Sequence, residues 1–348
     1  MPRADASARE PGALVEAARR GDRAALARAL SLIEQGGAPA REVGRLAHPH
    51  GGTAYTVGVT GAPGGGKSTL VAALVGVVRT GGQPVAVLAI DPSSPFTGGA
   101  ILGDRVRMSE HTLDPEVFIR SMASRGHLGG LALATPQAVR LLDATGIPWV
   151  LLETVGVGQV EVEVAGAADT TVVVVNPGWG DAVQASKAGL LEVADVFVVN
   201  KADRPGAADT RRDLEGMLEL GARPAGAWRP PVIEVVATQG RGVEDLWGAV
   251  ARHREHLEAT GALIDRRARR ATEELRAIVA RTLEERAAAV LGNDLDRLRD
   301  DVVDRSLDPY SAADRVLAAL DEAPGPFLPA KSPETADFPA KNGPGAEG

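Results

Sequence analysis

The feature that most constrains the fold is a glycine-rich stretch between an apolar run and a helical one. Residues 61–68 read Gly-Ala-Pro-Gly-Gly-Gly-Lys-Ser and fit the pattern G-x-x-x-x-G-K-[ST] of phosphate-binding loops. The apolar run Tyr55–Thr60 precedes this stretch, and the pattern from Lys67 onward predicts a helix. Glycines let backbone N–H groups curl around phosphate oxygens, and the helix N-terminus favours negative charge. The stretch therefore predicts a strand, a phosphate-binding loop (P-loop) and a helix, in that order.

Two side chains of this loop have distinct expected roles. Lys67 should reach the β- and γ-phosphates of a nucleotide, and the Ser68 hydroxyl should ligate Mg²⁺. The residues expected to contact the phosphates are Gly61, Ala62, Pro63, Gly64, Gly65, Gly66, Lys67, Ser68 and Thr69. The alternative is a glycine-rich turn without a ligand, which the flanking strand and helix disfavour.

From Tyr55 onward, short apolar runs alternate with helical stretches. The runs are 55–60, 85–90, 117–120, 149–153, 171–175, 196–200 and 232–236. Most are continuously apolar rather than alternating, which suits strands that are buried on both faces of a parallel sheet. With helices between them, they predict a doubly wound, mainly parallel α/β sheet.

The chain of 348 residues is long enough for this sheet domain and for helical additions. The predicted segments are a disordered N-terminus (1–12), an N-terminal helical extension (13–50), a P-loop domain (51–262), a C-terminal helical arm (263–322) and a disordered tail (323–348). The extension begins with a helical hairpin over 14–35, broken at Gly21-Asp22. The apolar stripe of the arm could pack against a second subunit or within the chain, and the pattern leaves both open.

Composition argues against several classes of protein. The 38 Lys and Arg against 46 Asp and Glu give a net charge of −8, which is a poor match for a nucleic-acid-binding face. The chain has no cysteine, which excludes disulfides, iron–sulfur clusters and thiol nucleophiles. Its apolar runs reach about six residues, far short of the roughly 20 needed to cross a bilayer, and the N-terminus lacks the apolar core of a signal peptide. We therefore expect a cytoplasmic protein that binds neither nucleic acid nor membrane.

A second motif, after the strand at 196–199, indicates guanine. Asn200-Lys-Ala-Asp203 fits N-K-x-D, and the Asp203 carboxylate could accept from both N1–H and the exocyclic amine of guanine. Adenine lacks this donor pair, so such a site rejects it. We expect Lys201 to lie along the base and Asn200 to tie this loop to the P-loop. The last base-binding loop should be Val236, Ala237 and Thr238, with the N–H of Ala237 as its main contact.

Acidic residues near strand ends are candidates for a magnesium site. Glu153 opens Glu-Thr-Val-Gly156, where a carboxylate would hold the Mg²⁺ shell and Gly156 would offer its N–H to the γ-phosphate. Asp91 and Asp104 could each reach the metal from a loop, or act as ordinary turn residues. The expected metal set is thus Ser68, Asp91, Asp104 and Glu153, and the expected catalytic set is Lys67, Asp91, Asp104 and Glu153.

The residue after Gly156 bears on the rate of hydrolysis. Val157 stands where Ras-like enzymes carry a glutamine that orients the attacking water, so we expect slow intrinsic hydrolysis that a partner or a second subunit accelerates.

His253 and His256 are three residues apart on a predicted helix, and no further candidate metal ligands accompany them. A solvated helix face is therefore favoured over a metal site.

Together, these motifs and several longer strings resemble the methylmalonyl-CoA mutase-associated GTPases, the MeaB/ArgK family. The resemblance covers about residues 26–320 and includes the strings 87–94, 97–105, 118–130, 153–159, 200–203 and 308–314. It implies a P-loop GTPase of the SIMIBI class whose C-terminal arm forms a homodimer. It also implies that Asp91, Asp104 and Glu153 surround Mg²⁺ and the γ-phosphate.

The family resemblance also implies a function and a partner. The chain would hydrolyse GTP as a chaperone of an adenosylcobalamin-dependent acyl-CoA mutase, with methylmalonyl-CoA mutase as the expected client. It would gate cofactor loading and protect or reactivate the mutase, without binding cobalamin itself. Residues 176–187 would form an extra switch loop, in which Trp179 and Ala182 replace the family's usual glycine and acid. Trp179 fits a contact with a partner, or packs on the protein's own surface.

Two alternatives come from other functional classes. One is a P-loop kinase or transport-associated ATPase that phosphorylates a protein partner, and Asp203 argues against it because ATP offers that carboxylate no donor pair. The other is a nickel-insertion GTPase, which would use cysteines or histidine-rich tracts. The chain has no cysteine and six scattered histidines, which disfavours this hypothesis.

Overall fold

The computed structural model describes residues 10–61, 63–91, 111, 113–123, 130–154, 166–178, 193–220, 224 and 226–323, with the backbone alone at 91, 123 and 130–132. The chain divides into two compact units, residues 1–275 and 276–348. The boundary lies inside helix α12 (Ala262–Leu291). The five-segment division of the chain stays a prediction.

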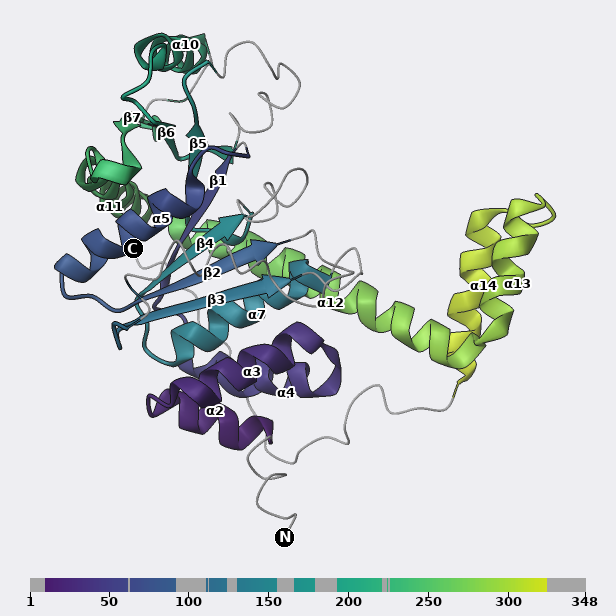
Figure 1. Ribbon diagram of the computed structural model, residues 1–348. Helices are drawn as coiled ribbons and strands as arrows, with labels where there is room; N and C mark the ends of the chain where they lie inside the picture. Colours follow the sequence, from purple (N-terminus) through teal and green to yellow (C-terminus); the bar gives the residue numbers. More distant parts are fainter. Residues whose placement is uncertain are drawn as a thin grey trace, which may run out of the picture. The chain divides into compact units, whose positions relative to one another are not determined.

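A seven-stranded parallel sheet forms the centre of the first unit (Figure 1). Its strands are β1 (Tyr55–Gly61), β2 (Val85–Asp91), β3 (Val117–Ala123), β4 (Trp149–Thr154), β5 (Thr170–Val175), β6 (Val196–Asn200) and β7 (Val232–Val235). They lie in the order β3-β2-β4-β1-β5-β6-β7, and every pair is parallel. The carboxyl ends of all seven strands therefore meet at one edge, where α/β sheets bind ligands.

Helices cover both faces of the sheet. They are α5 (Lys67–Thr80), α7 (Gly130–Ala144), α10 (Ala207–Leu220) and α11 (Val243–Thr260). One face packs against α5 and α11, and the other packs against α7 and α10. Successive strand residues point to opposite faces, so Val172 contributes to one core and Val173 to the other. The predicted doubly wound α/β fold is thereby confirmed.

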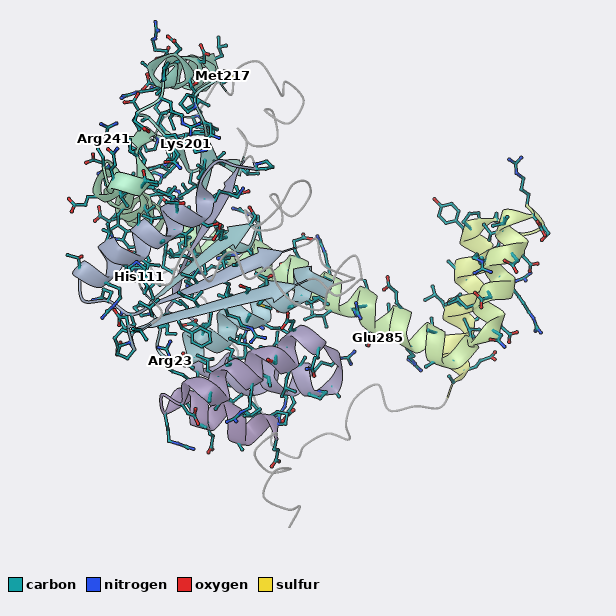
Figure 2. The ribbon with its side chains drawn as sticks, viewed as in Figure 1. Arg23, His111, Lys201, Met217, Arg241 and Glu285 are labelled. Carbon is teal, nitrogen blue, oxygen red and sulfur yellow. The ribbon has the colours of Figure 1, made fainter. Side chains whose placement is uncertain are left out.

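Within the described residues, three helices and a 3₁₀ turn precede the sheet. They are α2 (Pro11–Arg19), α3 (Arg23–Gln35), α4 (Gly37–Ala47) and η1 (His48–His50). Ile33 of α3 shares a core with Leu141 of α7. Asp22 caps α3 by accepting from two backbone N–H groups, which confirms the predicted break of the hairpin. Arg23 donates to Val117 O at 2.6 Å and joins α3 to β3 (Figure 2).

The first turns of α12 hold the amino ends of two strands. Asp169 precedes β5 and Asp195 precedes β6, and both carboxylates are buried. Arg266 donates to both oxygens of Asp195, at 2.7 and 3.0 Å, while Arg267 and Arg270 donate to Asp169. Burial raises the pKa of Asp169, but the two guanidinium groups outweigh burial and the net pKa is lowered. This charge network anchors α12 at the sheet edge opposite to the P-loop.

The second unit contains the end of α12, α13 (Asn293–Val303) and α14 (Pro309–Glu322). Arg286 of α12 donates to Leu320 O of α14 at 2.7 Å. Between residues 276 and 323, only Ala287 and Leu320 are buried. Large apolar side chains stay exposed, namely Ile278, Val279, Val290, Leu295, Val303 and Leu317. This unit therefore buries little apolar surface by itself. No helix in the described part of the chain is long and apolar enough to span a membrane.

Candidate nucleotide site

The P-loop connects β1 to α5 and depends on two glycines. Gly61 ends β1 with φ +130°, and a Cβ at this position would collide with the carbonyl oxygen of Val174 in the neighbouring strand. Gly66 has φ +85° and immediately precedes α5. Residues with a side chain rarely adopt such conformations. The two glycines thus let the chain turn tightly at the carboxyl edge of the sheet.

Two carbonyl groups of the loop are held by the last residue of β6 and by the residue after it. Asn200 Nδ2 donates to Gly65 O at 2.8 Å, and Lys201 Nζ donates to Gly64 O at 2.6 Å. No described peptide bond is cis, so each held carbonyl turns the following N–H, of Gly65 and Gly66, to the opposite side. Those N–H groups face away from the β6 turn. A phosphate-binding loop requires this arrangement, in which the carbonyl groups point away from the phosphates and the N–H groups point toward them.

Lys67 and Ser68 begin α5, and both side chains are buried. Lys67 Nζ donates to Gly61 O at 2.6 Å, and Ser68 Oγ donates to Glu153 Oε1. Glu153 lies in β4 opposite Val59 of β1, and its side chain is buried. Three residues of the predicted catalytic and metal sets thus lie at one place on the carboxyl edge.

The contact between Ser68 and Glu153 suits Mg²⁺, because hydroxyl and carboxylate oxygens are the hard donors that this ion prefers. Asp91 ends β2, one position beyond the pairing of Ile90 with Thr154, so its backbone lies at the same edge. Asp104 and Gly156 lie outside the described residues, as does Ala62. Within the described ranges, no three His, Asp or Glu side chains form a group that could hold a metal ion.

The base-binding motif lies in the turn between β6 and α10. Asn200 bridges two loops, since its Nδ2 contacts the P-loop and its Oδ1 accepts from Ala237 N at 3.3 Å. Lys201 has φ +59°, a left-handed conformation that turns the chain at the end of the strand. The Asp203 carboxylate is exposed two residues later. The turn therefore presents a solvent-facing acceptor beside the P-loop.

Burial and hydrogen bonds within the protein hold residues 236–238, the loop that the sequence predicts to contact the base. Val236 is buried, and its N–H donates to Arg241 O at 3.0 Å. Ala237 begins the 3₁₀ turn η3 (Ala237–Gln239), and its N–H is engaged by Asn200 in this structure. Thr238 is exposed. The role of this loop in base binding stays a prediction.

His253 corrects one expectation from the sequence. It is buried in α11 rather than on a solvated face, with Nδ1 2.8 Å from Thr170 Oγ1 and Nε2 3.3 Å from Asp195 Oδ1. Its ring centroid lies 4.8 Å from that of Trp228. Burial lowers the pKa of His253 to about 4. The prediction was wrong because helical periodicity does not reveal that α11 packs against the amino ends of β5 and β6.

Asn176 is a residue of the site that no motif marks. It directly follows β5, and its Nδ2 donates to Gly64 O at 3.4 Å. In the sequence it was only the first residue of the predicted switch loop. The one available signal was a polar side chain directly after an apolar strand. Trp179 and Ala182 lie outside the described residues.

Comparison with known proteins identifies the family. The family model described as "Methylmalonyl Co-A mutase-associated GTPase MeaB" matches residues 26–291. The chain belongs to the MeaB family. A putative GTPase of Pyrococcus abyssi is 49% identical over 311 residues, which cover 88% of this chain and 96% of that protein. A mouse protein named "Methylmalonic aciduria type A homolog, mitochondrial" is 34% identical over 265 residues, which cover 71% of this chain and 64% of that protein.

A solved structure agrees with the family assignment. A crystal structure of a protein named "LAO/AO transport system kinase" superposes with a TM-score of 0.66 at 28% identity, and covers 92% of this chain and all of that one. The MeaB-family chain is therefore a P-loop GTPase of the SIMIBI class, and it acts as a hydrolase on GTP.

Proposed function

We propose that this GTPase is a chaperone of an adenosylcobalamin-dependent acyl-CoA mutase, with methylmalonyl-CoA mutase as its client. It gates the loading of the cofactor and protects or reactivates the mutase, and the cobalamin is held by the mutase and not by this chain. The observation that carries the proposal is the MeaB match over residues 26–291, because that family is described as mutase-associated. The mouse relative's name, which refers to methylmalonic aciduria, supports it. We also propose that the protein acts in the cytoplasm.

For hydrolysis, we assign phosphate and metal binding to the residues at the ends of β1, β2 and β4. Lys67, whose ammonium lies at Gly61 O, would neutralise the β- and γ-phosphates. Ser68 and Glu153 would hold Mg²⁺ together with Asp91 and Asp104, and the hydrogen bond between Ser68 and Glu153 supports this set. When bound, Mg²⁺ stabilises negative charge on the phosphate oxygens.

Guanine recognition is assigned to the turn after β6. The Asp203 carboxylate would accept from N1–H and the exocyclic amine of the base, and its exposure leaves it accessible to a ligand. Asn200 would keep this turn in register with the P-loop, through its bond to Gly65 O. A site built on such paired hydrogen bonds discriminates strongly against a base that lacks the donors.

We further propose that the second unit forms a homodimer. The support is its composition: two buried side chains among residues 276–323, against the exposed apolar side chains on α12, α13 and α14. A helical unit that buries so little by itself gains stability when its apolar stripe packs against a second copy.

The test of the chaperone role is phosphate release from saturating GTP by the full chain, with and without the mutase loaded with cobalamin. We expect a slow basal rate, because Val157 replaces the water-orienting glutamine, and a severalfold rise with the mutase. Lys67→Ala with the same mutase is the matched control and should release no phosphate. If no cobalamin-dependent mutase changes the rate while GTP still binds, the client lies elsewhere.

One observation favours a second candidate function, a kinase or transport-associated ATPase acting on a protein partner. The relative of solved structure is named a transport system kinase. Nucleotide labelled at the γ-phosphate separates the two functions: a GTPase releases free labelled phosphate, whereas a kinase transfers the label to a protein. Competition of ATP against GTP for binding adds a second criterion, because guanine offers Asp203 the donor pair of N1–H and exocyclic amine, and adenine does not.

A further inference from the structure

The turn that follows β5 contacts the P-loop from the side opposite to β4. Val174 of β5 pairs with Gly61 of β1, so Asn176 lies two residues beyond this pair, where the P-loop begins. Asn176 Nδ2 donates to Gly64 O at 3.4 Å, and the same oxygen accepts from Lys201 Nζ at 2.6 Å. The Gly64 carbonyl is thus held by the residues that directly follow two different strands, β5 and β6.

The other end of this turn is fixed to α10. Gly178 has φ +83°, and its N–H donates to the hydroxyl of Thr210 at 3.1 Å. Thr210 is buried in the first turn of α10, the helix that follows the guanine motif. Residues 176–178 are therefore attached to the phosphate side at one end and to the base side at the other.

The Asn176 side chain also carries an acceptor, the amide oxygen Oδ1. Its Oδ1 is inaccessible to solvent, and no hydrogen-bond partner for it occurs among the described residues. A buried acceptor without a partner is unfavourable, so this oxygen does not stabilise the position of the side chain. The Nδ2 bond to the P-loop is the contact of this side chain that the structure shows.

We infer that Asn176 is a positioning residue for nucleotide binding. Its amide holds the Gly64 carbonyl outward, and this orients the N–H of Gly65 toward the phosphate side before the nucleotide arrives. The contribution is to affinity, because the orientation is needed equally for GDP and GTP, and Asn176 is not assigned to the γ-phosphate. The inference rests on the GTPase activity of the family and does not depend on the mutase.

The experiment measures GDP and GTP affinity and steady-state hydrolysis for the full chain with Asn176→Ala and Asn176→Asp. The alanine variant loses one neutral hydrogen bond and should weaken both nucleotides by about 2- to 10-fold, with kcat at saturating GTP unchanged. The aspartate variant loses the donor and adds a negative charge near the phosphates, so it should weaken binding by at least about tenfold. Added salt should reduce the difference between the two variants.

Controls separate positioning from general damage. Asn293→Ala changes an exposed asparagine at the start of α13 and should leave both affinities at the parent values. The unfolding midpoint of each Asn176 variant is measured alongside. Parent-like affinities in both folded Asn176 variants would overturn the inference. So would a fall in kcat with unchanged affinities, because Asn176 would then act on the reacting groups. If the alanine variant does not fold, the aspartate variant alone tests the inference. Weakened binding that depends on salt supports it, and parent-like affinities overturn it.

Discussion

Lowering the pH should destabilise the first unit through His253. The folded chain holds this buried side chain neutral with a pKa of about 4, whereas a histidine in the unfolded chain has a pKa near 6.5. Between these values the unfolded chain binds a proton that the folded chain does not, so the free energy of unfolding rises with pH. The contribution is complete above about pH 6.5 and is lost as the pH falls toward 4. Each pKa unit corresponds to roughly 1.4 kcal/mol, so the loss between about pH 7.5 and 4.5 is about 2–3 kcal/mol.

The structural reason is the surroundings of the ring. Burial removes water from His253, and the guanidinium of Arg266 offsets the attraction of the Asp195 carboxylate. His253→Gln removes the titrating ring while keeping a polar side chain of similar reach. The variant should be less stable at neutral pH, because its packing on Trp228 is lost. Its stability should fall by about 2–3 kcal/mol less than that of the parent over the same pH range.

The assay is urea unfolding at several pH values, followed by tryptophan fluorescence. All four tryptophans precede residue 275, so the signal reports the first unit. His50→Gln changes an exposed histidine and is the matched control, which should keep the pH dependence of the parent. If His253→Gln loses stability with falling pH as steeply as the parent does, the reasoning about burial is refuted.

Two further predictions concern carboxylates at opposite edges of the sheet. Asp203→Asn should weaken the preference for GTP over ATP in a competition assay, because an amide cannot accept from both guanine donors; an intact preference would show that the base site is wrongly assigned. Asp169→Asn should lower the free energy of unfolding by about 3 kcal/mol in urea, because Arg267 and Arg270 lose the buried charge they bind. Asp209→Asn, at an exposed helix position, is its control, and an equal loss there would contradict the argument.

Local patterns in the sequence determined much of this protein. The apolar runs predicted the positions of all seven strands, because parallel strands that are buried on both faces consist mainly of apolar residues. The P-loop was recognisable because its glycines and Lys67 act within eight consecutive residues. Asp22 marked the break in the first hairpin, because a cap bonds to the backbone of its own helix. In each case the interacting groups are neighbours in the chain.

Only the tertiary structure decided which distant side chains meet. Glu153 contacts Ser68 and Asn176 contacts Gly64 because β4 and β5 flank β1, an order that no local pattern encodes. The burial of His253, which was predicted to be solvated, follows from the packing of α11 against β5 and β6. Periodicity shows that a helix has an apolar face, but not how a polar residue near that face is paired. Those pairings depend on chain segments far away in the sequence, and so they appear only when the chain is folded.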